Sequence, residues 1–246
     1  MSDWLFDLGN SRFKAAPWQA DGGIGQLLAW PHGADALVAG DASQGSLPRG
    51  RRAWVASVAA PALTLQLLSL LRERFDQVHV AESRAECAGV RVAYAQPQRL
   101  GVDRFLALLG ARAMGGDVLV AGVGTALTID LLGADGVHHG GRIAASPTLM
   151  RQALHQRAAQ LPASGGSYRE FADDTDDALA SGCDGAAVAL IERSLRQGQE
   201  LLGRAPVLLL HGGGAPALQE LLPQARAHPA LVLEGLALWA SVHGNA

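Results

Sequence analysis

The chain has 246 residues, of which 49% are hydrophobic and 17% charged, and its formal net charge is −3. This length predicts one large domain or two lobes, each with a sizeable core. The slightly acidic balance argues against nucleic acid as the main partner, and we expect none.

The two cysteines, Cys87 and Cys183, fit neither a disulfide framework nor a metal-binding pattern. The N-terminus shows no basic segment followed by a long apolar run, and later apolar runs are short and interrupted by glycine or charge. We therefore expect a soluble, cytoplasmic protein without membrane association.

The first predicted element is a β-hairpin, with strands over residues 3–8 and 12–18 around a Gly9-Asn10 turn. Such a turn offers backbone N–H groups and Lys14 to phosphate oxygens, while Asp7 can orient a hydrated Mg²⁺. The same residues also suit an ordinary hairpin with an exposed lysine. The hairpin alone leaves both interpretations open.

The next segment, residues 21–50, predicts loops and weak strands, and we expect a solvated loop at Arg49-Gly50-Arg51-Arg52. The pattern then predicts a buried strand over 53–58, an amphipathic helix over 61–74 and a short strand over 78–80.

A Gly101-Val102-Asp103-Arg104 segment precedes a predicted helix over 103–114. Asp103 suits the cap or first turn of that helix, where the helix dipole stabilises a carboxylate. It equally suits a general base that takes a proton from a hydroxyl attacking phosphorus. Arg104 could then hold an anionic group of the same substrate.

A second glycine-centred hairpin follows, with strands over 118–121 and 126–132 around Gly122-Val123-Gly124. A dinucleotide-binding turn would need a third glycine and a following helix, but the residues after this turn alternate as a strand does. The chain therefore carries two similar hairpins, and the second also suits phosphate binding.

The remaining pattern predicts a strand over 137–144, helices over 147–160 and 176–202, a strand over 206–210, and helices over 215–222 and 232–242. The glycine run 212–214 has two possible roles. It lets a phosphate or a base approach the backbone closely, or it allows close packing at the start of a helix. An esterase oxyanion hole would need a G-x-S-x-G segment, which the chain lacks.

The chain also lacks a Walker A segment and the protein-kinase motifs, so ATP binding would depend on the two hairpins. The histidines show no metal-ligand spacing, and we expect structural or loop roles for His138, His139, His155 and His211.

Taken in order, these motifs resemble those of the type III pantothenate kinases, a family of the acetate and sugar kinase/Hsp70/actin superfamily. The resemblance covers nearly the whole chain. It rests on Asp7-x-Gly-Asn-Ser-x-x-Lys14, Tyr94, Gly101-x-Asp103-Arg104, Gly124-Thr125-Ala126-x-Thr128-x-Asp130, Gly140-Gly141-x-Ile143, Thr175 with Gly182, Gly212-Gly213-Gly214 and Leu231-Val232-Leu233-Glu234-Gly235-Leu236.

The resemblance implies an α/β protein of two ribonuclease H-like lobes, over 1–115 and 116–246, with ATP in the cleft between them, as in actin-like ATPases. The implied reaction is ATP-dependent phosphorylation of pantothenate to 4′-phosphopantothenate, the first step of coenzyme A biosynthesis. Members of the family are homodimers, so a homodimer is expected here.

The resemblance also assigns roles to individual residues. Those expected to bind ATP are Asp7, Gly9, Asn10, Ser11, Lys14, Thr125 and Gly213. Those expected near Mg²⁺ are Asp7 and Asp130, and the expected proton acceptor is Asp103. Those expected to contact pantothenate are Tyr94, Gly101, Val102, Arg104 and Thr175.

The chain departs from the family pattern at three places. Gly122 stands where the family usually has an aspartate that coordinates a monovalent cation, K⁺ or NH₄⁺, so we expect this ligand to be lost. Ala145-Ser146 replaces a usual Pro-Gly, and Phe105 replaces a usual tryptophan.

Two alternatives remain: another small-molecule kinase or an exopolyphosphatase-like hydrolase of the superfamily, and a non-catalytic regulator similar to accessory factors for gene expression. The Gly-x-Asp-Arg segment between the hairpins favours pantothenate kinase over the first. The presence of Asp7, Lys14 and Asp103 favours catalysis over the second.

Overall fold

The computed structural model describes residues 2–10, 12–19, 22–31 and 47–244. The chain forms two compact units. Unit 1 consists of Met1–Gly115, Gly136–His138 and Ala230–Ala246, and unit 2 of Gly116–Asp135 and His139–Pro229. The two units are defined by contacts between residues, whereas the expected lobes are defined by their fold. The units therefore do not test the expected lobe boundaries, which stay a prediction.

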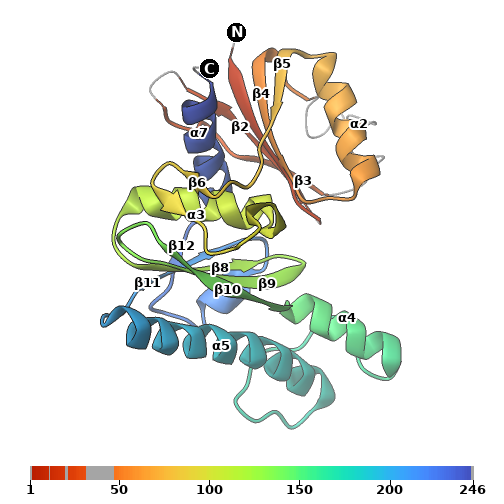
Figure 1. Cartoon of the computed structure of the whole chain (residues 1–246). Helices are drawn as coiled ribbons and strands as arrows, with labels where there is room; N and C mark the ends of the chain where they lie inside the picture. The colour runs from red at the N-terminus through yellow and green to blue at the C-terminus, as the bar shows by residue number, and fades with distance from the viewer. Residues whose placement is uncertain (1, 11, 20–21, 32–46, 245–246) are drawn as a thin grey trace. The chain divides into compact units, whose positions relative to one another are not determined.

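Unit 1 contains a five-stranded sheet in the order β3-β2-β1-β4-β5 (Figure 1). Its elements are β1 (Asp3–Leu8), β2 (Arg12–Trp18), β3 (Leu28–Pro31), β4 (Gly50–Ser57), α2 (Pro61–Arg72), β5 (Phe75–Val80), β6 (Glu86–Cys87), β7 (Val90–Arg91), the 3₁₀ helix η1 (Pro97–Arg99), α3 (Val102–Met114) and α7 (Leu231–His243).

Unit 2 contains a second five-stranded sheet in the order β10-β9-β8-β11-β12. Its elements are β8 (Val118–Val123), β9 (Ala126–Leu132), β10 (His138–Ala145), α4 (Pro147–Arg157), α5 (Thr175–Leu202), β11 (Val207–His211), α6 (Ala215–Gln219) and β12 (Arg226–Ala227).

The two sheets have the same topology. In each, the first two strands along the chain pair antiparallel as a hairpin, and the fourth strand pairs parallel with the first and with the fifth. The third strand lies beside the second at one edge. The turn after β1 and the turn after β8 therefore occupy equivalent places in the two units.

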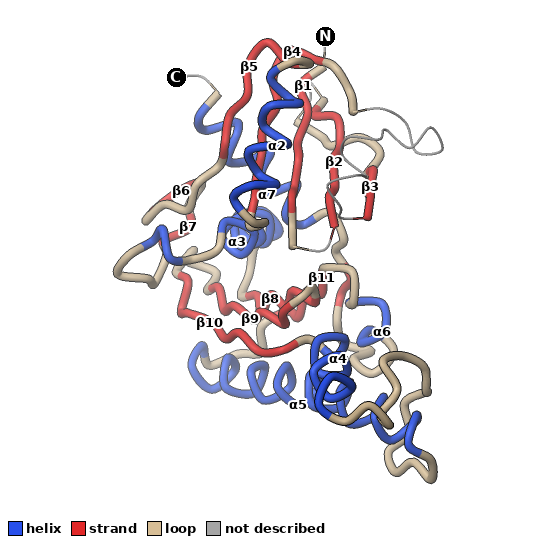
Figure 2. Tube along the Cα trace, turned by 90° about the vertical axis from the view of Figure 1, so that its right-hand side faces the viewer, coloured by secondary structure: helices blue, strands red, loops and turns tan. Residues whose placement is uncertain are grey.

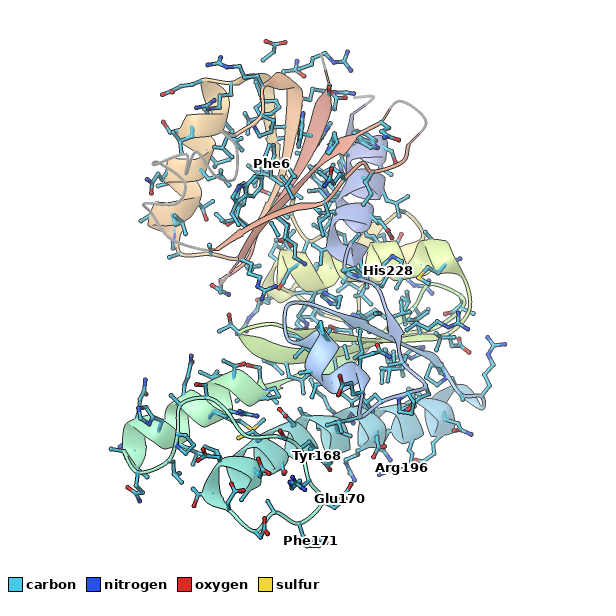
Figure 3. The ribbon with its side chains drawn as sticks, turned by 180° about the vertical axis from the view of Figure 1, so that it is seen from behind. Phe6, Tyr168, Glu170, Phe171, Arg196 and His228 are labelled. Atoms are coloured by element: carbon cyan, nitrogen blue, oxygen red, sulfur yellow. The ribbon has the colours of Figure 1, made fainter. Side chains whose placement is uncertain are left out.

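Alternation along β1 distinguishes the two faces of this sheet. Phe6 (Figure 3) and Leu8 are fully buried against α2 (Leu67, Leu71). The Phe6 ring stacks on Phe13 at 5.9 Å. Because successive strand residues face opposite sides, Asp7 lies on the side of the sheet away from α2.

Two glycines allow α3 and α7 to approach closely within unit 1. A Cβ at Gly110 would lie 2.5 Å from the Leu231 carbonyl oxygen, and a Cβ at Gly235 would overlap the Leu106 carbonyl oxygen. Helix α7 also packs on the sheet, where Trp239 meets the buried Trp54 edge to face at 5.9 Å. The glycine of the closing Leu-Val-Leu-Glu-Gly-Leu segment thus has a packing role.

In unit 2, α5 runs along one face of the sheet (Figure 2). Leu127 and Ile129 of β9 belong to the core on this face, together with Ile191 of α5. By the same alternation, Thr128 and Asp130 lie on the opposite face.

Most predicted elements are present, with shifts of a few residues at their ends. The predicted helices over 147–160 and 215–222 end earlier, at Arg157 and Gln219. The solvated loop expected at Arg49–Arg52 is wrong beyond its first residue, because β4 begins at Gly50 and Arg52 forms an ion pair with Asp3 at 2.6 Å. No described helix is both long and apolar enough to span a membrane.

Candidate active site

The first hairpin places an aspartate and a lysine opposite each other. Asp7 of β1 pairs with Lys14 of β2, and the turn closes through a hydrogen bond from Gly9 N to Arg12 O at 3.0 Å. Asn10 is exposed in this turn. Ser11, which was expected to bind ATP, lies outside the described residues.

The electrostatic environment of Asp7 is unusual. Burial raises the pKa of Asp7 to about 7, the Asp103 carboxylate adds to this rise, and the Lys14 ammonium opposes it. Like charges raise a carboxyl pKa only at short range. Asp103 therefore lies close enough to Asp7 in unit 1 for the two charges to interact, although 95 residues separate them in the sequence (103 − 7 − 1).

Asp103 lies in the first turn of α3, and Gly101 is the N-cap residue. Its Oδ1 accepts a hydrogen bond from Arg104 N at 2.8 Å, which fixes the carboxylate at the start of the helix. A Cβ at Gly101 would lie 2.7 Å from this same Oδ1. The glycine therefore leaves room for the carboxylate, and Val102 lies between the two as the first helical residue.

Arg104 is buried with only 6% of its surface exposed. Its Nη1 donates to the Tyr94 hydroxyl at 3.2 Å, and its guanidinium carbon lies 5.9 Å from the centre of the Tyr94 ring. A guanidinium held this way is oriented for a carboxylate or another anionic group.

One residue beside this pair was not predicted to belong to the site. The buried His138 ring is nearly parallel to the Tyr94 ring at 6.1 Å, and its Nδ1 accepts from Ala93 N at 3.5 Å. The His138-His139 sequence itself carries no signal that tells which of the two histidines lies beside Tyr94. The contact arises because residues 136–138 lie beside β7, with Val137 bridging to Arg91.

The second hairpin repeats the first in unit 2. Gly124 N donates to Ala126 O at 3.0 Å, and Thr125 is exposed at the turn. Ser146 Oγ donates to Thr125 O at 2.9 Å and also accepts from Leu149 N as the N-cap of α4. Ser146, which replaces a usual family glycine, thus supports the turn.

The glycine turn after β11 packs against this hairpin. Gly214 N donates to Val123 O at 2.9 Å. Gly212 has a φ of +94°, and Val123 O leaves no room for a side chain at this position. The packing interpretation of the glycine run is therefore confirmed for Gly212 and Gly214. Gly213 is exposed in the same turn.

Two further predicted residues lie elsewhere in unit 2. Asp130 is buried, with 3% of its surface exposed, in the middle of β9. Thr175 begins α5, directly after its N-cap Asp174, and helps to line an open hollow of about 500 Å³. The loop before it carries Tyr168, Glu170 and the almost fully exposed Phe171 (Figure 3).

The donor set at the first hairpin fits a magnesium ion. Among the described residues, no group of three or more His, Cys, Asp and Glu side chains could enclose a metal. Mg²⁺ does not need such a cage, because it usually keeps several waters and binds one or two carboxylates together with substrate phosphates. Asp7 offers the required oxygen ligands, and a cation would offset the effect of its burial.

Apart from Asp130 and Thr175, the predicted site residues that the structure describes thus form one set in each unit. In unit 1 the structure brings Asp7, Lys14 and Asp103 together electrostatically, and it connects Arg104 with Tyr94. In unit 2 it holds the Gly124-Thr125 turn against the glycine turn after β11.

Several solved structures share this fold. The activator of 2-hydroxyisocaproyl-CoA dehydratase from Clostridium difficile, solved with ADPNP, superposes with a TM-score of 0.52 at 10% identity, covering 100% of this chain and 96% of that one. A Campylobacter jejuni protein, described as a proposed Baf family transcriptional activator, gives 0.64 at 20% identity, covering 99% and 100%. The fold is that of actin-like ATPases and sugar kinases, as expected.

Sequence comparison is more specific. A curated relative from Stenotrophomonas maltophilia (strain K279a), named type III pantothenate kinase, is 68% identical over 240 residues, which cover 98% of each chain. The family model of type III pantothenate kinase matches residues 4–197. This chain therefore belongs to the type III pantothenate kinase family.

Proposed function

We propose that this protein transfers the γ-phosphoryl group of ATP to the 4′-hydroxyl of pantothenate. Family membership supports the reaction, and the charge interaction between Asp7 and Asp103 is the structural observation that carries it. Asp7, proposed to act beside the phosphates, and Asp103, proposed to accept the proton, interact electrostatically within one unit, as suits phosphoryl transfer to an alcohol.

Asp103 is the proposed proton acceptor. The pantothenate hydroxyl oxygen forms a bond to the γ-phosphorus, the bond from that phosphorus to the bridging oxygen of ADP breaks, and the hydroxyl proton passes to Asp103. Oδ1 accepts from Arg104 N at 2.8 Å, and this bond orients the carboxylate. The first turn of α3 keeps the carboxylate in place.

The two hairpins are proposed to bind the nucleotide. Lys14 and the N–H groups around Gly9 and Asn10 would contact phosphate oxygens, as would the Thr125 turn and Gly213 in unit 2. Magnesium held near Asp7, with Asp130 as a second carboxylate, would neutralise phosphate charge. Ser11 is proposed here from its motif alone.

Pantothenate carries a carboxylate, and Arg104 is proposed to hold it. The hydrogen bond to Tyr94 fixes the guanidinium before substrate arrives, which lowers the entropic cost of binding. Gly101, Val102 and Thr175 are proposed as further contacts.

We also propose that the protein is a homodimer. Family resemblance suggests it, and unit 2 exposes large apolar side chains that a partner subunit could cover, among them Ile143, Leu154 and Phe171. Light scattering after size-exclusion chromatography would give twice the chain mass.

A coupled ADP-release assay with different acceptors tests the function. The purified protein is supplied with Mg-ATP and with pantothenate, glucose or no acceptor. We expect ADP release that depends on pantothenate, and mass spectrometry should detect 4′-phosphopantothenate.

Turnover with glucose but not pantothenate would assign the chain to another activity of the superfamily. Release without any acceptor would indicate a hydrolase, and the absence of release under every condition would indicate a non-catalytic relative. Each of these results would overturn the proposal.

A further inference from the structure

Three neighbouring strands of unit 2 bring three residues to the same level. Gly122 of β8 pairs with Thr128 of β9 on one side and with His211 of β11 on the other. A Cβ at Gly122 would lie 2.7 Å from His211 Nε2 and 2.8 Å from Thr128 Oγ1. Real Cβ atoms do not approach other atoms this closely, so a side chain at 122 would displace the imidazole from this position.

This arrangement does not fit a monovalent cation. Gly122 is the position where the family resemblance predicts an aspartate and a bound K⁺ or NH₄⁺. An alkali cation needs oxygen ligands, whereas imidazole nitrogen suits transition metals. Here Gly122 has no side-chain oxygen, and the His211 ring lies against the position that a Cβ would take, so the residues present do not fit the expected ligand set.

His211 also lies where the nucleotide is proposed to bind. It is the last residue of β11, directly before the glycine turn, and this turn is hydrogen-bonded to the end of β8 through Gly214 N and Val123 O. In open α/β sheets, ligands bind at the carboxyl ends of parallel strands. His211 and Thr128 are both partly exposed, so a ligand can reach them.

We propose that this enzyme binds no monovalent cation at Gly122 and that the His211 side chain takes the cation's place, donating a hydrogen bond to a nucleotide phosphate. This inference rests on the proposed ATP-dependent function. An imidazole can donate from Nε2 when it is neutral in that tautomer and also when it is charged. Thr128 Oγ is the second polar group at the same place.

Cation exchange tests the inference without any substitution. Affinity for a non-hydrolysable ATP analogue is measured by calorimetry with Mg²⁺ in potassium, ammonium or tetramethylammonium chloride at equal ionic strength. We expect affinities within about twofold of one another, and pantothenate turnover that is equally insensitive. A loss of more than about tenfold in tetramethylammonium would overturn the inference.

Two substitutions separate hydrogen bonding from packing. His211→Leu fills the space without a donor, whereas His211→Gln keeps an N–H donor of similar reach. We expect the leucine variant to weaken analogue binding about tenfold and the glutamine variant to weaken it less. Equal affinity in all three proteins would contradict a phosphate contact. Thermal unfolding of each variant confirms that it is folded.

A double variant tests the exchange of ligands directly. Gly122→Asp combined with His211→Ala restores a carboxylate and removes the ring, so we expect analogue binding to become potassium-dependent. Potassium independence in this variant, alongside potassium dependence of the wild type, would refute the inference. Because these are binding measurements, they remain decisive if pantothenate proves not to be the acceptor.

Discussion

Gly110 and Gly235 lie against each other where α3 crosses α7, so that a Cβ on Gly235 would lie 3.1 Å from Gly110 N as well as overlapping the Leu106 carbonyl oxygen. Alanine usually stabilises a helix relative to glycine, but here the overlap dominates. We expect Gly235→Ala to lower the free energy of unfolding by about 1–3 kcal/mol, as measured by urea denaturation.

Gly182 of α5 is the matched control for this substitution. Among the described residues, no atom beyond the neighbouring residues and the nearby backbone of α5 lies within 4 Å of a Cβ built there, so Gly182→Ala should be neutral or stabilise by up to about 1 kcal/mol. Similar destabilisation of both variants would mean that the helix crossing is not the cause.

The buried Asp117 is held by two partners, the Arg204 guanidinium and Ala134 N, the latter at 2.6 Å. The hydrogen bond from Arg204 lowers the pKa of Asp117 below its usual value, and the bond from Ala134 adds to this, against the effect of burial. A depressed folded-state pKa contributes stability above the unfolded pKa of about 4, and this contribution is lost as the pH falls through the folded value.

Asp117→Asn should therefore lower the thermal midpoint at neutral pH, and its difference from the wild type should shrink below about pH 4. Asp76→Asn, which alters an exposed carboxylate of β5, should leave the midpoint nearly unchanged. A pH-independent effect of Asp117→Asn would show that the pairing of charges is not responsible.

The raised pKa of Asp7 predicts the opposite dependence on pH. Its value of about 7 lies above that of an unfolded aspartate, so the folded protein binds this proton more tightly. Without nucleotide and Mg²⁺, the stability due to protonated Asp7 should be present below about pH 4 and disappear as the pH rises through about 7.

The difference in unfolding midpoint between wild type and Asp7→Asn, recorded at several pH values, measures this contribution. The asparagine variant should lack the decline, and at high pH Mg²⁺ with an ATP analogue should stabilise the wild type more than the variant. Parallel pH curves for the two proteins would contradict the raised pKa.

Tyr94→Phe removes the hydroxyl that accepts a hydrogen bond from Arg104 at 3.2 Å. The guanidinium should then be less well oriented, and we expect KM for pantothenate to rise about three- to tenfold with little change in kcat or in KM for ATP. The chain has one other tyrosine, Tyr168, and Tyr168→Phe is the matched control. Steady-state kinetics with each substrate varied would reveal the difference, and an unchanged KM would exclude the role.

Sequence patterns predicted the elements that carry strong local signals. The alternation in residues 3–8, 12–18 and 126–132 matches β1, β2 and β9 to the residue. The two-residue strands β6, β7 and β12 were not predicted, because so few residues show no periodicity and their pairing depends on neighbours.

The site was predictable where it depends on a local segment, as in the Gly101–Arg104 turn. It was not predictable where it depends on strand register or packing. The approach of His211 to Gly122 arises because β11 pairs with β8, although 88 residues lie between the two positions (211 − 122 − 1). The stacking of His138 beside Tyr94 likewise depends on a distant segment joining unit 1.

The central claim, that Asp103 receives the pantothenate proton during phosphoryl transfer, is tested most directly by Asp103→Asn. The amide oxygen can still accept from Arg104 N, so the start of α3 should remain intact. We expect formation of labelled 4′-phosphopantothenate from γ-labelled ATP to fall by at least about 100-fold, while affinity for an ATP analogue stays within about twofold. Turnover equal to that of the wild type, in a variant that binds the analogue normally, would contradict the account.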